Sequence, residues 1–174
     1  MSSSFDLGDV DRITVGTVGP AGRRVFYLQA TSGAQVVSLK LEKTQVAALV
    51  TYLKTMLSDL PSPGPWPNDT DLVEPVVAEW VVGALGVSYD EESDRILVQA
   101  EEMVGEMDGE EPDDGGRGDG ASARFLATRE QVAALAARGA DVVAAGRPPC
   151  QLCGQPLDPE GHLCVRLNGH RSQR

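Results

Sequence analysis

The chain has 174 residues, a formal net charge of −11 and a hydrophobic content of 41%. This length allows one domain with its own core plus an appendage. The acidic balance argues against a protein that coats nucleic acid or an anionic membrane, because both need a basic surface. No apolar run is long enough to span a bilayer, and the N-terminus lacks the basic and apolar regions of a signal peptide. We therefore expect a cytoplasmic protein.

The first half of the chain predicts three strands followed by a helix. β-rich segments at 13–18, 25–28 and 35–41 are separated by glycine-containing turn signals. Residues 42–58 then carry apolar side chains at helical spacing, from Val46 to Leu57, which predicts a helix with one buried face. Residues 61–69 hold four prolines and predict a linker, because proline lacks the N–H group that helices and central strands need.

The second half repeats this order. Segments at 80–86 and 95–100 resemble 13–19 and 24–30, a short strand follows at 124–126, and the sequence Gln131–Leu135 is identical to Gln45–Leu49. Thr128 and Gln131 form a capping box for the second helix. We therefore predict an α+β body, residues 1–146, built from two βββα pseudo-repeats at about 5–60 and 72–146, each with antiparallel strands and one helix. The alternative is that two ordinary stretches share letters by chance.

Residues 101–120 interrupt the second pseudo-repeat with an acidic, glycine-rich stretch. Such a composition cannot bury apolar surface, so we predict a solvated, mobile loop. The alternating oxygen ligands of an EF-hand are absent from it, which argues against a calcium site.

The tail, residues 147–174, predicts a zinc site. All three cysteines and both histidines of the chain lie here, namely Cys150, Cys153, His162, Cys164 and His170. In a reducing cell interior, three cysteines indicate metal ligation rather than a disulfide framework. Sulfur and nitrogen donors favour zinc over hard cations, and four protein ligands leave no open position, so we expect a structural site. The ligands are Cys150, Cys153, Cys164 and His162, with His170 as the alternative to His162.

The surroundings of the Cys-x-x-Cys pair fit a metal-binding turn. Gly154 follows the second cysteine and permits a positive φ, which lets backbone N–H groups point at the sulfurs. A thioredoxin-like redox pair would open a helix, which Pro148, Pro149 and Pro156 disfavour. The remaining alternative is a disordered tail in which the cysteines are incidental.

Four arginines give the tail a basic character that the body lacks. Arg147, Arg166, Arg171 and Arg174 face only two acidic residues in the tail. They could contact the phosphates of a nucleic acid, as in zinc ribbons, or dock on the acidic body. We favour docking on the body and expect nucleic acid not to be the partner.

The body offers few catalytic side chains. Residues 1–146 contain no histidine or cysteine, which excludes a nucleophile–histidine site there unless the tail folds back to complete one. Phosphate-binding glycine motifs are also absent. Carboxylates are the remaining candidates for acid–base chemistry, although surface charge explains them more simply: Asp6, Asp9, Asp11, Glu74, Glu79, Asp90 and Glu101.

The two ends of the chain resemble a known family. The strings GRPPCQLCGQPLDPEGHLCVRLNG at 146–169 and FDLGDVDRITVGTVG at 5–19, with the segment around Trp80, resemble an uncharacterised actinobacterial family, domain of unknown function 3090. The resemblance spans essentially the whole chain. It implies no assigned activity, and it implies neighbours that are histidine-phosphatase-like and kinase-like proteins. The family pattern has proline where this chain has Val165, and it often lacks histidine at the position of His170, which favours His162 as the ligand.

Together these features predict a cytoplasmic, zinc-stabilised binding or adaptor protein. Its partners would be other proteins, among them the phosphatase-like and kinase-like neighbours. The alternatives are a nucleic-acid-associated zinc-ribbon protein that uses the tail arginines, and an enzyme with carboxylates in a cleft.

Overall fold

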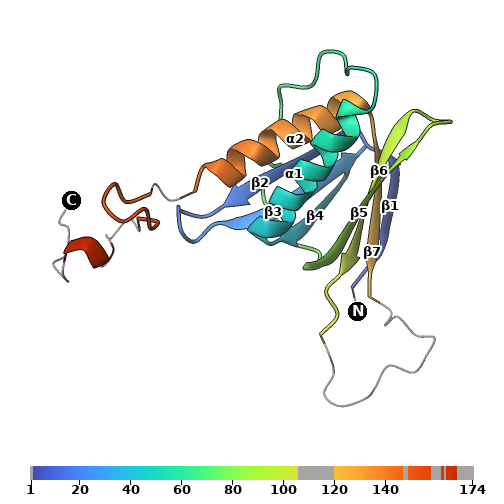
Figure 1. Cartoon of the computed structure of the whole chain (residues 1–174). Helices are drawn as coiled ribbons and strands as arrows, with labels where there is room; N and C mark the ends of the chain where they lie inside the picture. The colour runs from blue at the N-terminus through green and yellow to red at the C-terminus, as the bar shows by residue number, and fades with distance from the viewer. Residues whose placement is uncertain (1, 106–119, 147–148, 158–161, 163, 168–174) are drawn as a thin grey trace, which may run out of the picture.

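The computed structural model describes residues 2–105, 120–146, 149–157, 162 and 164–167. It confirms an α+β fold. A four-stranded sheet has the order β1-β7-β6-β5, and a three-stranded sheet has the order β2-β3-β4. The helices α1 and α2 lie side by side and cover one face of these sheets (Figure 1).

The three-stranded sheet is an antiparallel meander that leads into α1. Its strands are β2 (Arg12–Val18), β3 (Val25–Ser32) and β4 (Gln35–Leu41), close to the predicted segments. Helix α1 (Lys43–Ser58) follows at once and buries Val46, Leu49, Val50 and Leu53, which confirms the predicted apolar stripe. Gln45 completes a capping box with Glu42 at the start of this helix.

The four-stranded sheet contains a second antiparallel meander that leads into α2. Its strands are β5 (Val82–Asp90), β6 (Arg95–Glu102) and β7 (Ser122–Ala127). Helix α2 (Arg129–Ala144) begins at the predicted capping box, in which the Thr128 hydroxyl accepts from the Gln131 N–H. Each meander therefore ends in a helix of 16 residues that starts with the same glutamine-based cap.

The first strand, β1 (Phe5–Asp9), departs from the prediction of antiparallel strands in each half. Although β1 lies in the first half of the sequence, it pairs in parallel with β7 of the second half. The chain then crosses between the sheets at Val10, whose N–H donates to Leu126, and at Asp11, whose N–H donates to Thr31. Parallel pairing is possible because a long stretch of chain, rather than a hairpin, connects β1 to β7.

A second junction joins the opposite edges of the two sheets. Lys40 of β4 forms an isolated parallel bridge with Val81, just before β5. The side chains of both sheets and both helices make one buried cluster that extends from Val10 to Val142. Its apolar members are mainly valine, leucine, isoleucine and alanine, as the low aromatic content predicts.

The proline-rich segment between α1 and β5 lies on the surface, since residues 61–69 are mostly exposed. Residues 61–69 contain no helix or strand. Of the predicted acidic loop 101–120, Glu101 and Glu102 belong to β6, and residues 106–119 lie outside the described residues.

Candidate metal centre

The tail begins with a tight turn around the Cys-x-x-Cys pair. The Cys150 N–H donates to the Gln155 carbonyl at 2.7 Å, and the Gly154 N–H donates to the Cys150 carbonyl at 2.8 Å. Gly154 has a φ of +72°, the left-handed conformation that glycine adopts without strain. The predicted glycine turn is therefore present.

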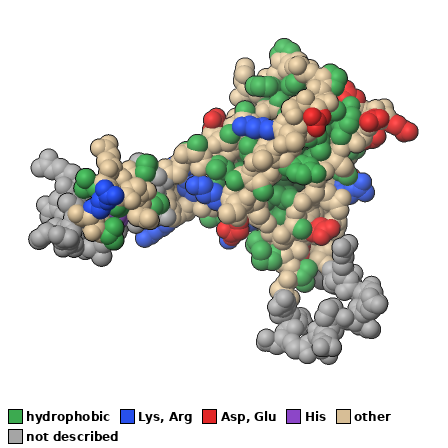
Figure 2. Space-filling view, in the orientation of Figure 1, with side chains coloured by type: hydrophobic (Ala, Val, Ile, Leu, Met, Phe, Trp, Pro, Cys, Tyr) green, Lys and Arg blue, Asp and Glu red, His purple; other side chains and the backbone are tan. Residues whose placement is uncertain are grey.

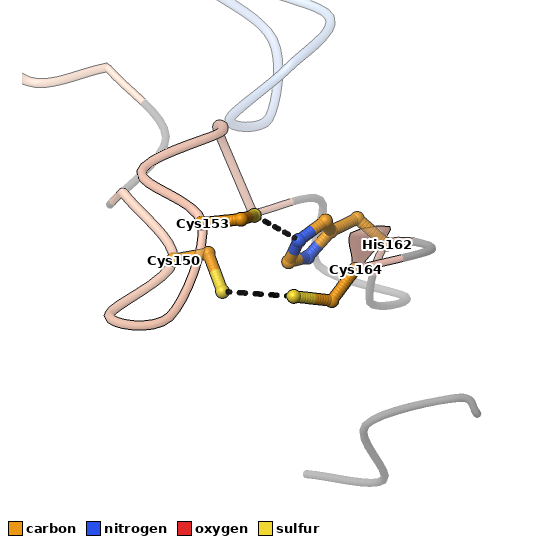
Figure 3. Close-up of side chains that lie close together, drawn as sticks. All are labelled: Cys150, Cys153, His162 and Cys164. Carbon is orange, nitrogen blue, oxygen red and sulfur yellow. Dashed lines mark hydrogen bonds between the residues drawn. The ribbon is translucent and has the colours of Figure 1, made fainter. Parts of the chain in front are cut away.

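Four donor atoms converge at this turn. The sulfurs of Cys150, Cys153 and Cys164 and a ring nitrogen of His162 all lie within 4.8 Å of one another (Figure 3). Cys153 Sγ is 3.1 Å from His162 Nε2, and Cys150 Sγ is 4.0 Å from Cys164 Sγ. Two thiolates on a tetrahedral zinc, each about 2.3 Å from the ion, lie roughly 3.8 Å apart. The spacing and the donor types therefore fit a tetrahedral metal ion.

The environment of the cluster favours metal ligation. Cys150 and Cys164 are buried, with exposed fractions of 8% and 1%, while Cys153 and His162 are half-buried. Backbone N–H groups of Cys153 and Leu152 lower the pKa of the Cys150 thiol, and a backbone N–H that points at a sulfur stabilises the thiolate a metal binds. The Gln155 N–H acts in the same direction on Cys153, but burial and the sulfurs of Cys164 and Cys150 outweigh it and raise that pKa.

The rest of the tail has little apolar packing of its own. Leu152 and Val165 are 50% and 80% exposed. Val165 opens a single 3₁₀ turn, η1 (Val165–Leu167). Arg166 is exposed, whereas Arg147, Arg171, Arg174 and His170 lie outside the described residues. Within the described part of the tail, the side chains of this Cys/His cluster thus form the buried centre.

The sequence matches the family described as Protein of unknown function (DUF3090) over residues 5–164. The chain belongs to this family. No curated protein and no solved structure matches the chain. Neither α1 nor α2, the two helices of the described residues, is long and apolar enough to cross a membrane. The match includes all four residues of the cluster, and the expected actinobacterial origin stays a prediction.

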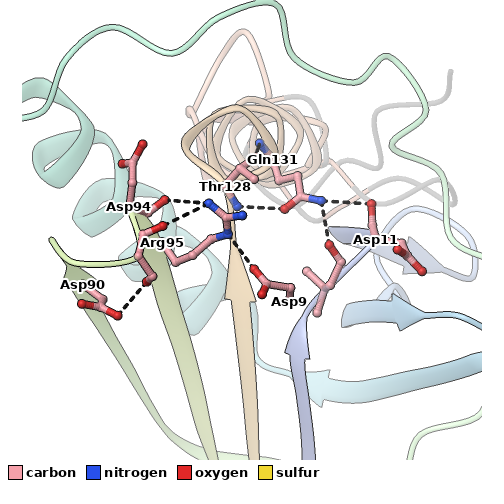
Figure 4. Close-up of polar contacts among 9 residues, drawn as sticks. Asp9, Asp11, Asp90, Asp94, Arg95, Thr128 and Gln131 are labelled. Atoms are coloured by element: carbon pink, nitrogen blue, oxygen red, sulfur yellow. Dashed lines mark hydrogen bonds and ion pairs between the residues drawn. The ribbon is translucent and has the colours of Figure 1, made fainter.

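In this DUF3090 protein four of the candidate carboxylates bind partner groups at the surface of the fold. Asp9 pairs with Arg95 at 2.6 Å, and Asp90 accepts from the Ser93 hydroxyl at 2.6 Å (Figure 4). Asp11 accepts from the Gly33 N–H at 2.7 Å. Asp6 accepts from the nearby Gly8 N–H. The partners of these four carboxylates are groups in surface turns and the half-buried Arg95, and the hydrogen bonds above give no two of the four carboxylates a common partner.

The remaining three predicted carboxylates, Glu74, Glu79 and Glu101, do not form a site either. Glu74 and Glu101 are exposed, and Glu79 contributes its backbone N–H to Ser38 at the junction of the sheets. None of the seven carboxylates lines the cavities beside α1 or at the end of α2.

Sequence reasoning missed the polar cluster that holds the β5–β6 turn against α2. Arg129 makes two hydrogen bonds of 3.1 Å to Asp94 and one of 2.6 Å to the Pro61 carbonyl. The guanidinium of Arg129 and the hydroxyl of Tyr89 lower the pKa of Asp94. No local pattern announces this cluster, because Asp94 and Arg129 are 35 positions apart.

Proposed function

We propose that this DUF3090 protein is a cytoplasmic protein-binding adaptor whose tail is folded around a structural zinc ion. The observation that carries the zinc assignment is the convergence of Cys150, Cys153, His162 and Cys164 within 4.8 Å. Three sulfurs and one nitrogen form a donor set that zinc prefers over calcium or magnesium.

A structural role follows from the number of ligands. Four protein donors complete a tetrahedral shell and leave no position for water or substrate, which a catalytic zinc needs. The exposed Leu152 and Val165 support the same conclusion, because a tail that buries so little apolar surface needs a crosslink such as a metal ion to stay folded. Zinc would form that crosslink and hold the turn at Gly154 against the segment that contains His162 and Cys164.

The adaptor role is supported by what the body contains. Residues 1–146 lack histidine and cysteine, and the candidate carboxylates are engaged in turns or ion pairs rather than gathered in a cavity. Binding of another protein requires none of these catalytic groups. The resemblance to the family indicates histidine-phosphatase-like and kinase-like partners.

We also propose that the body arose from an internal repeat. Besides capping its own helix, Gln45 donates to the Val82 carbonyl at 3.0 Å, and Gln131 donates to the Val10 carbonyl at 2.9 Å. Each glutamine therefore binds the chain where it enters the other half of the body. Each half thus makes the same kind of contact with the other half. This symmetry supports a common origin better than the identical residues alone.

The zinc assignment is tested by metal analysis of the purified full chain. We expect stoichiometric zinc in the wild type and in the control Gln151→Ser, which changes an exposed neighbour, and its loss in Cys153→Ser. His162→Ala and His170→Ala identify the fourth ligand, because only the true ligand lowers the zinc content. A wild-type chain without stoichiometric zinc refutes the site.

The adaptor role is tested with the purified phosphatase-like and kinase-like neighbours. We expect co-elution with at least one of them in size-exclusion chromatography at physiological salt. Separate elution of all three proteins at micromolar concentrations contradicts the proposed partners.

A further inference from the structure

Strand β5 has an open edge. It is the outer strand of the four-stranded sheet, and within the described residues the bridge that joins β4 to this part of the chain, Lys40–Val81, lies just before β5. Within the described residues, no strand therefore pairs with residues 83–90 on that side. A row of unpaired N–H and C=O groups on such an edge is a template for another strand.

An apolar groove runs beside this edge. Side chains of α1 and backbone and side chains of β5, among them Ala48, Tyr52, Leu85 and Val87, enclose a cavity of about 420 Å³. A second hollow of about 670 Å³ continues along α1 and shares Ala48 and Tyr52 with the first. Figure 2 shows hydrophobic side chains gathered in this region, between α1 and the β5–β6 hairpin. Tyr52 is 59% exposed, so its ring is available to a partner.

The groove contrasts with the packing of α2. At Gly139, a Cβ atom would lie 2.4 Å from Val50 and 3.3 Å from Val15, so α2 fits closely against both α1 and β2. Where α1 passes β5, the cavity beside Ala48 and Tyr52 lies between the two elements. The apolar surface of α2 is thus covered by α1 and β2, while the side of α1 that carries Ala48 and Tyr52 remains open.

The edge has few of the features that protect exposed strands. Residues 83–89 contain no charged residue and no proline, which are usual means of blocking edge pairing; Asp90 ends the strand, and a register irregularity lies at its start, between Val82 and Ala84. Gly86 has an ordinary backbone conformation, and a Cβ there would meet nothing within 4 Å. Neither strain nor internal packing explains this glycine. A glycine inside a strand also marks the close approach of another backbone.

The charge near the groove indicates what kind of strand fits. Asp59 at the end of α1 lines the second hollow, and Asp90, Glu91 and Glu92 form the exposed turn of the β5–β6 hairpin. Both lie at the same end of the groove, because Arg129 joins the segment after α1 to the hairpin. At the other end the lining residues Gln45 and Gly83 are uncharged. The lining of the two hollows therefore carries no charge apart from Asp59 at the hairpin end.

This charge pattern argues against three other occupants. A second copy would bring its own acidic hairpin, with Asp90 on β5, and a further net charge of −11, which leaves the acidic end unmatched. Residues 106–119 are strongly acidic, and residues 168–174 contain no apolar side chain for the groove.

We propose that the open edge of β5 binds an extended segment of a partner protein as an added strand. Backbone hydrogen bonds to residues 83–90 would provide affinity, as in other cases of strand addition. An apolar side chain of the partner fills the cavity beside Tyr52, and a lysine or arginine of the partner lies at the acidic end. This inference rests on the proposed adaptor function, and it names the surface and the chemistry of the partner.

The test uses the ¹⁵N-labelled, zinc-loaded full chain and a defined probe. The probe is an acetylated, amidated peptide of alternating valine and threonine that ends in two lysines. We expect chemical-shift changes confined to residues 83–90 of β5 and to the face of α1 that carries Ala48 and Tyr52. Two control peptides should lose this binding at least tenfold: one is N-methylated at alternate positions and cannot pair, and one has glutamates in place of the lysines.

Two surface variants locate the binding. Ala48→Arg fills the groove and Tyr52→Ala removes its exposed wall, and each should weaken binding at least tenfold. Both residues are exposed, so the fold should persist, and Ala137→Arg on the exposed face of α2 is the matched control. No shift at millimolar peptide, equal binding by Ala48→Arg, or dimerisation through β5 in place of peptide binding overturns the proposal. Cys153→Ser should bind the peptide as well as the wild type, so the zinc site and the groove can fail separately.

Discussion

Gly139→Ala tests whether the two helices are as closely packed as the structure shows. The added methyl group would lie 2.4 Å from Val50 Cγ2 and 3.3 Å from Val15 Cγ2. Non-bonded carbon atoms normally stay about 3.5–4.0 Å apart. Val50 has little freedom to move, because a β-branched side chain in a helix has one strongly preferred χ1 rotamer. Either α2 must shift away from α1 or the contact stays strained.

The two opposing contributions of this substitution can be estimated. Replacing glycine by alanine in a helix interior favours the folded state by about 1 kcal/mol. Overpacking of a close-packed core costs about 1–3 kcal/mol, and the severe overlap with Val50 places this case near the upper end. We therefore expect the free energy of unfolding to fall by about 2 kcal/mol. For a chain of this size, that lowers the melting temperature by roughly 4–8 °C.

Urea unfolding followed by circular dichroism measures this change. Ala137→Gly, at an exposed position of the same helix, calibrates the propensity term and should cost about 1 kcal/mol. In a Val50→Ala background the overlap disappears, so Gly139→Ala should become neutral or stabilising there. A Gly139→Ala single variant as stable as the wild type, or a double-mutant cycle without coupling, refutes the close helix contact.

Three further outcomes follow from the contacts. Chelation of zinc should open the tail to limited proteolysis while the melting temperature of the body stays constant, because the four ligands lie outside the core cluster. The pKa of Asp94 is lowered in the folded state, mainly by Arg129, so the ion pair stabilises above the pKa of an unfolded aspartate and is lost as the pH falls through the folded value. Asp94→Asn should therefore flatten the acid limb of stability against pH, and an unchanged limb contradicts this role. Gln131→Ala removes the bonds to Thr128 and Val10 and should cost about 1–2 kcal/mol in urea unfolding, against no measurable loss for the control Arg124→Ala.

Local patterns predicted the elements that local chemistry determines. The apolar stripe from Val46 to Leu57 and the capping box at Thr128 are short-range features, and both helices follow them closely. Strand β1 was not predicted, because Asp6, Gly8 and Asp9 interrupt the apolar pattern of its five residues. Its stability comes from parallel pairing with β7, more than a hundred positions later in the chain.

The same distinction applies to the candidate sites. The four residues of the candidate metal site could be predicted because all four lie within 15 positions of each other, where spacing alone restricts their geometry. The Asp94–Arg129 cluster and the groove beside β5 could not, because each joins surfaces that are distant in the sequence. Gly86 carried a signal for the groove, as a glycine inside a strand. Only the three-dimensional fold shows that neither a turn nor a neighbouring side chain requires glycine at this position.

Different interactions stabilise the body and the tail, so the function of each part can be tested separately. The body has a core that extends from Val10 to Val142, whereas the buried centre of the described part of the tail consists of the four side chains of the candidate metal site. Loss of a ligand should therefore unfold the tail and leave the groove intact, while a groove variant should leave the zinc content unchanged. A partner that loses affinity for both Cys153→Ser and Ala48→Arg would contact the tail and the body together. A partner affected by Ala48→Arg alone would assign recognition to the body and a supporting role to the zinc.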